Sequence, residues 1–349
     1  MEYEILGGTG LRVSRLCLGT MMFGPQGNSS LSDCRKIIDQ ALDSGINFVD
    51  TADIYSDGES ERIVGAALRG KRSDVYLATK FGLSAAPGLR GGSRQSIIRS
   101  VEASLTRMQT DYIDLYQIHR YDADTDLEEV LFTLTELVNQ GKVRYFGSSM
   151  FSPDRIVESH WRAENRHTMR FRTEQVRYSI FSREAEETVL HTCSRYGMGV
   201  AVWSPLDGGY LSGKYRTPGD LSSNSRIARF EKLTRGRFDP SGEVEQRKLA
   251  LCSELSKLAG EAALSLPQMA IAFTLANAHV TSAIVGPRTL TQLMSLLPAG
   301  TTELDTDTLN RIDMLVPPGC RIANISLPNS RRGKSRSQTI PHAKRRRNH

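Results

Sequence analysis

Four polar side chains with complementary chemistry follow three apolar segments in the first third of the chain. They are Asp50, Tyr55, Lys80 and His119. A tyrosine hydroxyl ordinarily has a pKa of about 10, too high for an efficient proton donor near neutrality. A lysine ammonium beside it favours the phenolate, and an aspartate carboxylate keeps that buried lysine charged. With a histidine in reach of the same substrate oxygen, the set suits protonation of the oxyanion that forms when a hydride adds to a carbonyl carbon.

A purely structural role for these residues is the alternative. An Asp–Lys ion pair can close the rim of a sheet, with a tyrosine packed nearby. Any one of the four residues fits that role as well as the chemical one. Their occurrence at the ends of three consecutive strand segments favours chemistry.

The elements that must position these side chains alternate regularly along the chain. Stretches such as 200–202 are apolar without alternation, which is typical of parallel strands buried on both faces. Eight strand–helix units predict an α/β fold, a (β/α)8 TIM barrel, rather than an open doubly wound sheet. The predicted strands are 15–19, 47–50, 75–80, 113–119, 143–148, 172–175, 199–204 and 281–285. The predicted helices are 33–44, capped by Ser32, and 59–68, 93–108, 127–140, 154–165, 184–196, 267–278 and 290–297.

Three further segments lie outside this count. Residues 3–14 predict an N-terminal β-hairpin, because glycines 7, 8 and 10 precede a strand and not the helix that a phosphate loop requires. Residues 207–243 are rich in Gly, Ser and Arg and predict a long functional loop. Extra helices are expected near 245–260 and 305–316. We expect residues 1–328 to form a single barrel domain.

The charge of the chain is concentrated at its C-terminal end. The formal net charge is +6, but eight of the 45 basic residues lie in 329–349, which holds no acidic residue. The remaining 37 basic and 39 acidic residues leave the body slightly acidic. Segment 329–349 is predicted to be a disordered tail, and no nucleic-acid partner is expected, although binding through this tail stays an alternative.

Cysteine usage and hydropathy restrict the class of protein further. The five cysteines are scattered without a CxxC pair, which argues against a zinc site and a disulfide framework, so no metal is expected. No run approaches the ~20 apolar residues of a membrane span, and the acidic N-terminus lacks a signal-peptide core. A cytoplasmic protein is expected.

Several motifs, taken together and in order, resemble the aldo-keto reductase superfamily over residues 3–316. They are Leu18-Gly19-Thr20-Met21, Asn47-Phe48-Val49-Asp50-Thr51-Ala52 leading to Tyr55, Ala78-Thr79-Lys80, Asp114-Leu115-Tyr116-Gln117-Ile118-His119, Trp203-Ser204-Pro205-Leu206 and Gly213-Lys214-Tyr215. The sequence looks most similar to the bacterial branch that also resembles potassium-channel β subunits. The resemblance implies that Tyr55 is the general acid, Lys80 lowers its pKa, Asp50 holds Lys80, and His119 orients the carbonyl.

The resemblance also implies NADPH or NADP⁺, bound without a Rossmann fold. Ser149 and Gln175 would hold the carboxamide, and Trp203 would stack on the nicotinamide. The nicotinamide ribose would lie against Gly19, Thr20, Met21 and Asp50, the pyrophosphate against Ser204, Leu206, Gly208 and Lys214, and the adenosine end against Gly286, Arg288 and Gln292.

The chain departs from the family pattern at two places in this cofactor site. Met150 stands where many members have an Asn that contacts the carboxamide. Met294 and Leu296 replace polar residues that grip the adenine. Both departures remove polar contacts from the cofactor.

The sequence as a whole therefore predicts an NADP-dependent enzyme that reduces a small aldehyde or ketone. An enone or keto-sugar reductase and a low-turnover NADPH-binding regulatory subunit stay open as alternatives. The carbonyl substrate and the oligomeric state stay undetermined.

Overall fold

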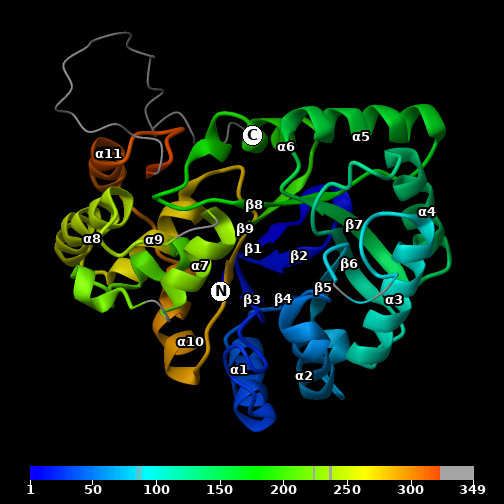
Figure 1. Cartoon of the computed structure of the whole chain (residues 1–349), viewed down its shortest axis with the longest axis horizontal. Helices are drawn as coiled ribbons and strands as arrows, with labels where there is room; N and C mark the ends of the chain where they lie inside the picture. Colours follow the sequence, from blue (N-terminus) through cyan, green and yellow to red (C-terminus); the bar gives the residue numbers. More distant parts are fainter. Residues whose placement is uncertain (85, 87, 223–224, 236–237, 323–349) are drawn as a thin grey trace. The chain divides into compact units, whose positions relative to one another are not determined.

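The computed structural model describes residues 1–322 except 85, 87, 223–224 and 236–237 (Figure 1). The basic tail predicted for 329–349 lies outside these residues. The chain divides into two compact units. The first, here called the barrel unit, comprises residues 1–176, 189–203 and 279–300; the second unit comprises 177–188, 204–278 and the described residues from 301 onward.

Eight parallel strands close into a barrel, which confirms the predicted TIM-barrel fold. Their order around the barrel is β10-β3-β4-β5-β6-β7-β8-β9. In most of these strands every side chain is buried, or every one except the last. This agrees with the apolar runs without alternation, which predicted strands buried on both faces. The strands are β3 (Leu16–Gly19), β4 (Phe48–Asp50), β5 (Tyr76–Phe81), β6 (Ile113–Ile118), β7 (Val143–Ser149), β8 (Thr173–Arg177), β9 (Gly199–Trp203) and β10 (Ser282–Val285).

The N-terminal hairpin is also confirmed. Strand β1 (Tyr3–Ile5) pairs antiparallel with β2 (Arg12–Ser14) around a 3-10 turn at Gly7–Thr9. Gly7 has a φ of +55°, and a Cβ there would lie 2.4 Å from the backbone N of Gly199. The glycine therefore serves a tight turn against β9.

The helices of the barrel unit lie outside its strands (Figure 1). The predicted cap of the first helix was wrong by two residues: Ser30, and not Ser32, accepts the N–H of Asp33 with its side chain, because the helix begins at Leu31. The predicted helix 184–196 is interrupted. Its start forms a short 3-10 turn, Glu184–Glu186. The helices are α1 (Leu31–Asp43), α2 (Glu59–Ala67), α3 (Arg94–Met108), α4 (Leu127–Asn139), α5 (Pro153–Arg166), α6 (Val189–Arg195) and α10 (Leu290–Leu296).

The second unit contains α7 (Arg226–Arg235), α8 (Glu243–Glu261), α9 (Leu266–Ala276) and α11 (Thr306–Leu315). Helices α8 and α11 confirm the two predicted extra helices. The prediction of a loop throughout 207–243 was wrong in part, because α7 and two 3-10 turns interrupt it. The Gly and Ser residues around α7 concealed its short amphipathic pattern.

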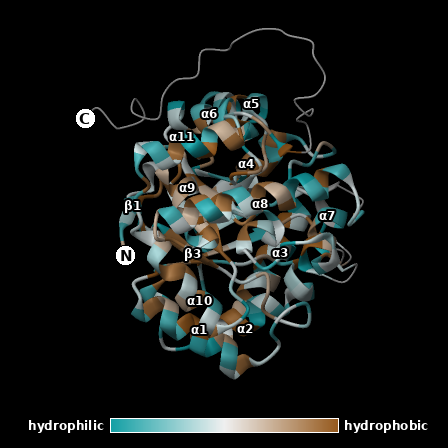
Figure 2. Ribbon diagram, turned by 90° about the vertical axis from the view of Figure 1, so that its left-hand side faces the viewer, coloured by the Kyte–Doolittle hydropathy of each residue, from teal (hydrophilic) through white to brown (hydrophobic). Residues whose placement is uncertain are grey.

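The core of the barrel is formed by side chains from successive strands. Cys17, Phe48, Ala78, Leu115 and Ala201 pack together there with almost no exposure. Figure 2 shows β3 as hydrophobic and the surrounding helices with alternating hydrophilic and hydrophobic residues. Within the described residues, no single helix is long and apolar enough to cross a membrane; α8 and α9 reach that length and composition only as a pair bent by 86°.

Candidate active site

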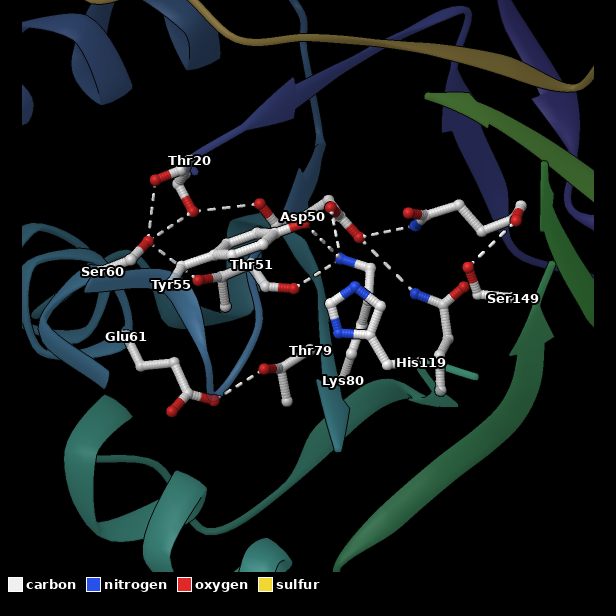
Figure 3. A network of polar contacts seen from close by, with 12 residues as sticks. Thr20, Asp50, Thr51, Tyr55, Ser60, Glu61, Thr79, Lys80, His119 and Ser149 are labelled. Carbon is white, nitrogen blue, oxygen red and sulfur yellow. Dashed lines mark hydrogen bonds and ion pairs between the residues drawn. The ribbon is translucent and has the colours of Figure 1, made fainter. Parts of the chain in front are cut away.

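The predicted Asp50, Tyr55 and Lys80 lie together at the carboxyl ends of β4 and β5 (Figure 3). The Nζ of Lys80 donates to Oδ2 of Asp50 and to the carbonyl of Thr51, both at 2.7 Å, and lies 3.4 Å from the hydroxyl oxygen of Tyr55. Lys80 is fully buried and Asp50 nearly so. A buried ammonium is thus held between a carboxylate and a phenol.

His119 lies on the other side of this group, directly after β6. Its ring meets the ring of Tyr55 edge-on, with 6.1 Å between centroids and 84° between planes. Among the described residues, its buried Nδ1 has no hydrogen-bond partner. The described residues therefore leave one nitrogen of the imidazole without a hydrogen bond.

The protonation states of these groups follow from burial and charge. Burial raises the pKa of Tyr55, and the Asp50 carboxylate adds to the rise, while the Lys80 ammonium opposes it. Burial lowers the pKa of Lys80, but Asp50 and Tyr55 outweigh this effect and raise it overall. Burial, with the charges of Lys80 and Arg120, holds the pKa of His119 well below its usual value. At neutral pH the site therefore contains a protonated phenol, an ammonium and a neutral imidazole.

The effect of Lys80 on Tyr55 differs from the sequence-based expectation in one respect. Lys80 lowers the pKa of Tyr55 as predicted, but burial exceeds that effect, so the pKa ends above its ordinary value. The Tyr55 phenol is therefore protonated at neutral pH. The Lys80 ammonium, 3.4 Å from the hydroxyl oxygen, favours the phenolate form of Tyr55.

A hydroxyl network fixes the backbone on which Asp50 and Tyr55 stand. The hydroxyl of Thr20 lies 3.0 Å from the Asp50 carbonyl oxygen and 3.0 Å from the Ser60 hydroxyl, which also contacts Thr51 at 3.0 Å (Figure 3). Nearby, Glu61 accepts the Thr79 hydroxyl at 2.6 Å and an N–H of Arg107 at 2.6 Å.

Ser149 is the last residue of β7, and it pairs across the sheet with Gln175, which lies within β8. The hydroxyl of Ser149 donates to the Gln175 carbonyl at 3.1 Å. The side-chain amide of Gln175 donates to Oδ1 of Asp50 at 2.9 Å. Of the two predicted carboxamide ligands, Gln175 thus contacts Asp50 directly, and Ser149 contacts the backbone of Gln175.

Met150 and Trp203 lie close together although 53 positions separate them. The indole Nε1 of Trp203 is 3.4 Å from the thioether sulfur of Met150. Met150 is 40% exposed and has a φ of +58°, a left-handed conformation that suits Asn better than Met. A half-buried indole with a flexible thioether at its edge is therefore presented at the mouth of the barrel.

The residues predicted for the adenosine end and the ribose lie along β3 and β10. A Cβ at Gly19 would lie 2.6 Å from Cγ2 of Ile284, so the glycine permits close pairing of the two strands. Gly286 and Arg288 are exposed after β10, and Met21 is half-buried after β3. The Gln292 side chain accepts the backbone N–H of Arg288 at 2.8 Å, which fixes the turn that carries the arginine.

The four residues predicted to face the pyrophosphate belong to the second unit. Ser204 accepts the backbone N–H of Gly208 at 2.9 Å, and Leu206 is half-buried. Gly208 has a φ of +71°, and a Cβ there would lie 2.2 Å from Cδ1 of Phe230. Lys214 is exposed at the end of the same segment.

The structure adds titratable groups that the sequence analysis did not assign. Glu174 is buried on β8, accepts the Ser148 hydroxyl at 2.6 Å, and has its pKa raised to about 8 by burial. Asp53 is buried near Glu61, and burial together with that second carboxylate raises its pKa to about 7. Arg120 follows His119 directly and influences Tyr55. Their positions near strand ends were visible in the sequence, but their burial was not.

Nothing in the described residues resembles a metal site. No group of three or more His, Cys, Asp or Glu side chains there could hold a metal ion. All five cysteines are free thiols.

The chain is similar in sequence to known oxidoreductases and to potassium channel β subunits. The model of the aldo/keto reductase family matches residues 15–317. The uncharacterized oxidoreductase YrpG of Bacillus subtilis (strain 168) is 40% identical over 335 residues, which cover 91% of this chain and 97% of that protein. The probable voltage-gated potassium channel subunits beta of Oryza sativa subsp. japonica and Arabidopsis thaliana are 34% and 33% identical, each over 86% of this chain and 91% of the relative.

Proposed function

The chain belongs to the aldo/keto reductase family of oxidoreductases, and we propose that it reduces an aldehyde or ketone to an alcohol with NADPH. The observation that carries the proposal is the position of the Lys80 ammonium, 2.7 Å from Asp50 and 3.4 Å from the Tyr55 hydroxyl. A neutral histidine stands beside the same hydroxyl. This arrangement supplies a proton where a carbonyl oxygen gains negative charge.

Each residue has a distinct task in the proposed reaction. When bound, a reduced nicotinamide supplies a hydride to the carbonyl carbon. Tyr55 donates its phenolic proton to the carbonyl oxygen. Lys80 stabilises the resulting phenolate, and Asp50 keeps Lys80 charged and in place. His119 orients the carbonyl by a hydrogen bond from its neutral ring.

The residues of the barrel unit suit a nicotinamide dinucleotide. Trp203 offers an indole face, and Ser149 and Gln175 offer hydroxyl and amide groups beside it. Arg288 is an exposed cation after β10, where a guanidinium could bind a 2′-phosphate in bidentate fashion. Ser204, Leu206, Gly208 and Lys214 are proposed to contact the pyrophosphate, by family resemblance.

The proposed partner is a small carbonyl compound that serves as substrate. We propose no nucleic-acid partner. We propose a cytoplasmic location, since five free thiols suit a reducing compartment. The basic tail is proposed to take no part in the reaction.

A low-turnover regulatory subunit is the second candidate function. It is favoured by the two plant relatives described as probable potassium channel subunits beta. In that role the chain would bind NADPH tightly and reduce every carbonyl at rates well below ~1 s⁻¹, under the ordinary range for enzymes.

A panel of aldehydes, ketones and enones tests both candidates. Turnover is followed by the loss of NADPH absorbance, and the products are analysed for reduced C=O or C=C bonds. We expect alcohols from simple carbonyls. Tight NADPH binding without turnover on the whole panel would favour the regulatory subunit, and saturated ketones from enones would favour an enone reductase.

The cofactor preference has a separate test. Arg288→Ala is expected to weaken NADPH binding by about tenfold or more, because it removes charge-assisted hydrogen bonds to a phosphate, and to leave NADH binding nearly unchanged. Equal weakening of both dinucleotides would contradict the role given to Arg288.

A further inference from the structure

Arg120 is a cation at the active site that the proposed chemistry does not use. It follows His119 at the end of β6, and its side chain is exposed. One guanidinium nitrogen, Nη1, donates to the carbonyl oxygen of His119 at 2.7 Å. This contact turns the guanidinium back over the strand end that carries the catalytic histidine.

Three groups of the site experience the charge of Arg120. Its guanidinium lowers the pKa of Tyr55, of His119 and of Glu174. These residues belong to three different parts of the barrel: the segment after β4, the end of β6 and strand β8. Arg120 follows β6 at the carboxyl end of the parallel barrel strands, the end at which Asp50, Lys80 and His119 also lie.

The guanidinium has no anionic partner in the described part of the chain. No carboxylate there lies within 4.0 Å of it, whereas other arginines, such as Arg107 and Arg155, each pair with a glutamate, at 2.6 and 2.7 Å. Burial raises the pKa of Glu174 to about 8, so this carboxyl group is protonated near neutrality and does not neutralise Arg120. Surrounding protein partly desolvates Arg120, which lowers its pKa. An exposed guanidinium without a counterion is free to pair with the anionic group of a ligand.

The position of Arg120 separates it from the proposed cofactor phosphates. Strand β6 stands four places from β10 in the eight-stranded barrel, on the opposite side. Arg288, the cation proposed for the adenosine end, follows β10. Arg120 therefore lies on the side where the carbonyl meets Tyr55 and His119.

We propose that Arg120 binds an anionic group of the substrate, so that the enzyme acts on aldehydes or ketones that also carry a carboxylate or a phosphate. This inference rests on the proposed carbonyl reduction and narrows its substrate class. The guanidinium has five N–H donors in a planar fork, which matches both anions. The anion would be held beside the reacting carbonyl by donors that His119 leaves free.

Matched substrates test the proposal. Steady-state kinetics compare 4-carboxybenzaldehyde with 4-nitrobenzaldehyde, and glyceraldehyde 3-phosphate with glyceraldehyde, in the wild type and in Arg120→Gln. We expect kcat/KM for the preferred anion to fall by about ten- to a hundredfold in the variant, mainly through KM, because a charge-assisted contact is lost. The uncharged partner should stay within about twofold. The anionic substrate whose kcat/KM falls more in Arg120→Gln identifies the preferred anion as a carboxylate or as a phosphate.

Two further variants serve as controls. Arg120→Lys should recover part of the loss, because it keeps the charge but not the fork. Arg155→Gln removes a nearby arginine that already pairs with Glu158 and should affect charged and uncharged substrates alike. Equal losses on both members of a substrate pair in Arg120→Gln, or no loss on either, would overturn the proposal.

A binding measurement keeps this inference separate from the proposed function. Titration calorimetry measures benzoate and inorganic phosphate binding to the wild type and to Arg120→Gln in the presence of NADP⁺. We expect at least one of these anions to bind about tenfold more weakly to the variant. If the wild type reduces no carbonyl, carbonyl reduction fails as the function; if both anions bind both proteins equally, the role of Arg120 fails, whatever the turnover.

Discussion

Lys80 contacts three oxygen atoms of the candidate active site. Its ammonium meets the Asp50 carboxylate, the Thr51 carbonyl and the Tyr55 hydroxyl. Because Lys80 is fully buried, its charge acts on Tyr55 with little screening by water. At the scale of single residues, the pKa of the phenol therefore depends most on burial, which raises it, and on the Lys80 ammonium, which lowers it.

Met150 and Gln175 provide a residue-scale prediction about the proposed carboxamide site. Gln175→Ala should weaken cofactor binding more than Met150→Ala, because the amide would contact the carboxamide and also donates to Asp50 at 2.9 Å. Met150→Asn should tighten binding by roughly two- to tenfold, the worth of one hydrogen bond. Asn also tolerates the φ of +58° at this position better than Met does.

The measurement is cofactor Kd by fluorescence quenching of the three variants. Met150→Ala is the matched control, since it removes the thioether without adding an amide. A silent Gln175→Ala beside a damaging Met150→Ala would mean that the ends of β7 and β8 are wrongly assigned to the carboxamide.

The catalytic candidates could be predicted from sequence because each ends a strand or follows one closely. Asp50, Lys80 and His119 occupy equivalent places in consecutive strand–helix units, and parallel strands bring such places to one edge. The amide of Gln175 on Asp50 could not be predicted, since the rotamer of a glutamine is not encoded in its neighbours. The dominance of burial over Lys80 at Tyr55 likewise depends on packing that only the structure supplies.

At the scale of elements, the strands were the most predictable part of the molecule. All eight were located within about two residues, because burial on both faces requires continuous apolar runs. Helix α7 was missed because the glycines and serines that flank it indicate a loop. The break before α6 was missed because the amphipathic pattern of residues 184–196 continues across it.

Strand β8 carries an element-scale prediction about stability. Burial raises the pKa of Glu174 to about 8, from about 4.3 in an unfolded chain. Between these values the unfolded chain releases the proton and the folded protein retains it, so the free energy of unfolding falls as pH rises from about 4 to about 8. Glu174→Gln mimics the protonated acid and should remove this loss.

Denaturant unfolding of the wild type and Glu174→Gln at pH 5 and pH 9 measures the effect. The two proteins should be similar in stability at pH 5. At pH 9 the variant should be more stable by a few kcal/mol, which is the free-energy equivalent of a shift of several pKa units. The same difference at both pH values would show that Glu174 does not titrate in this range. Asp53 is present in both proteins and cancels in the comparison.

At the scale of the whole molecule, two compact units divide the described chain, and residues 1–328 were predicted to form a single domain. The second unit contains a buried ion network of its own. Lys248 lies 2.7 Å from Asp207 and 2.6 Å from Glu231, and Arg177 lies 2.6 Å from Asp207. Although burial raises the pKa of Asp207, Lys248 and Arg177 outweigh it and hold that pKa well below its usual range. Removal of Lys248 would leave two buried carboxylates short of a counterion.

Lys248→Met tests whether the chain unfolds as one domain. Loss of one partner from a buried ion pair costs about 3–5 kcal/mol. Both tryptophans of the protein, Trp161 and Trp203, belong to the barrel unit, while Lys248 belongs to the second unit. If residues 1–328 form a single domain, Lys248→Met lowers the midpoint temperature measured by tryptophan fluorescence and the one measured by far-ultraviolet circular dichroism by the same amount. An unchanged tryptophan transition beside an earlier loss of helix signal would instead indicate two domains.

Tyr55→Phe tests most directly whether Tyr55 gives the proton in the proposed carbonyl reduction by NADPH. The substitution removes one oxygen atom and keeps the ring that meets His119. Turnover of the best carbonyl in the panel, followed by NADPH absorbance, should fall by at least ~10²-fold, while the Kd of NADPH stays within about twofold. A variant that retained most of the wild-type turnover would contradict the account.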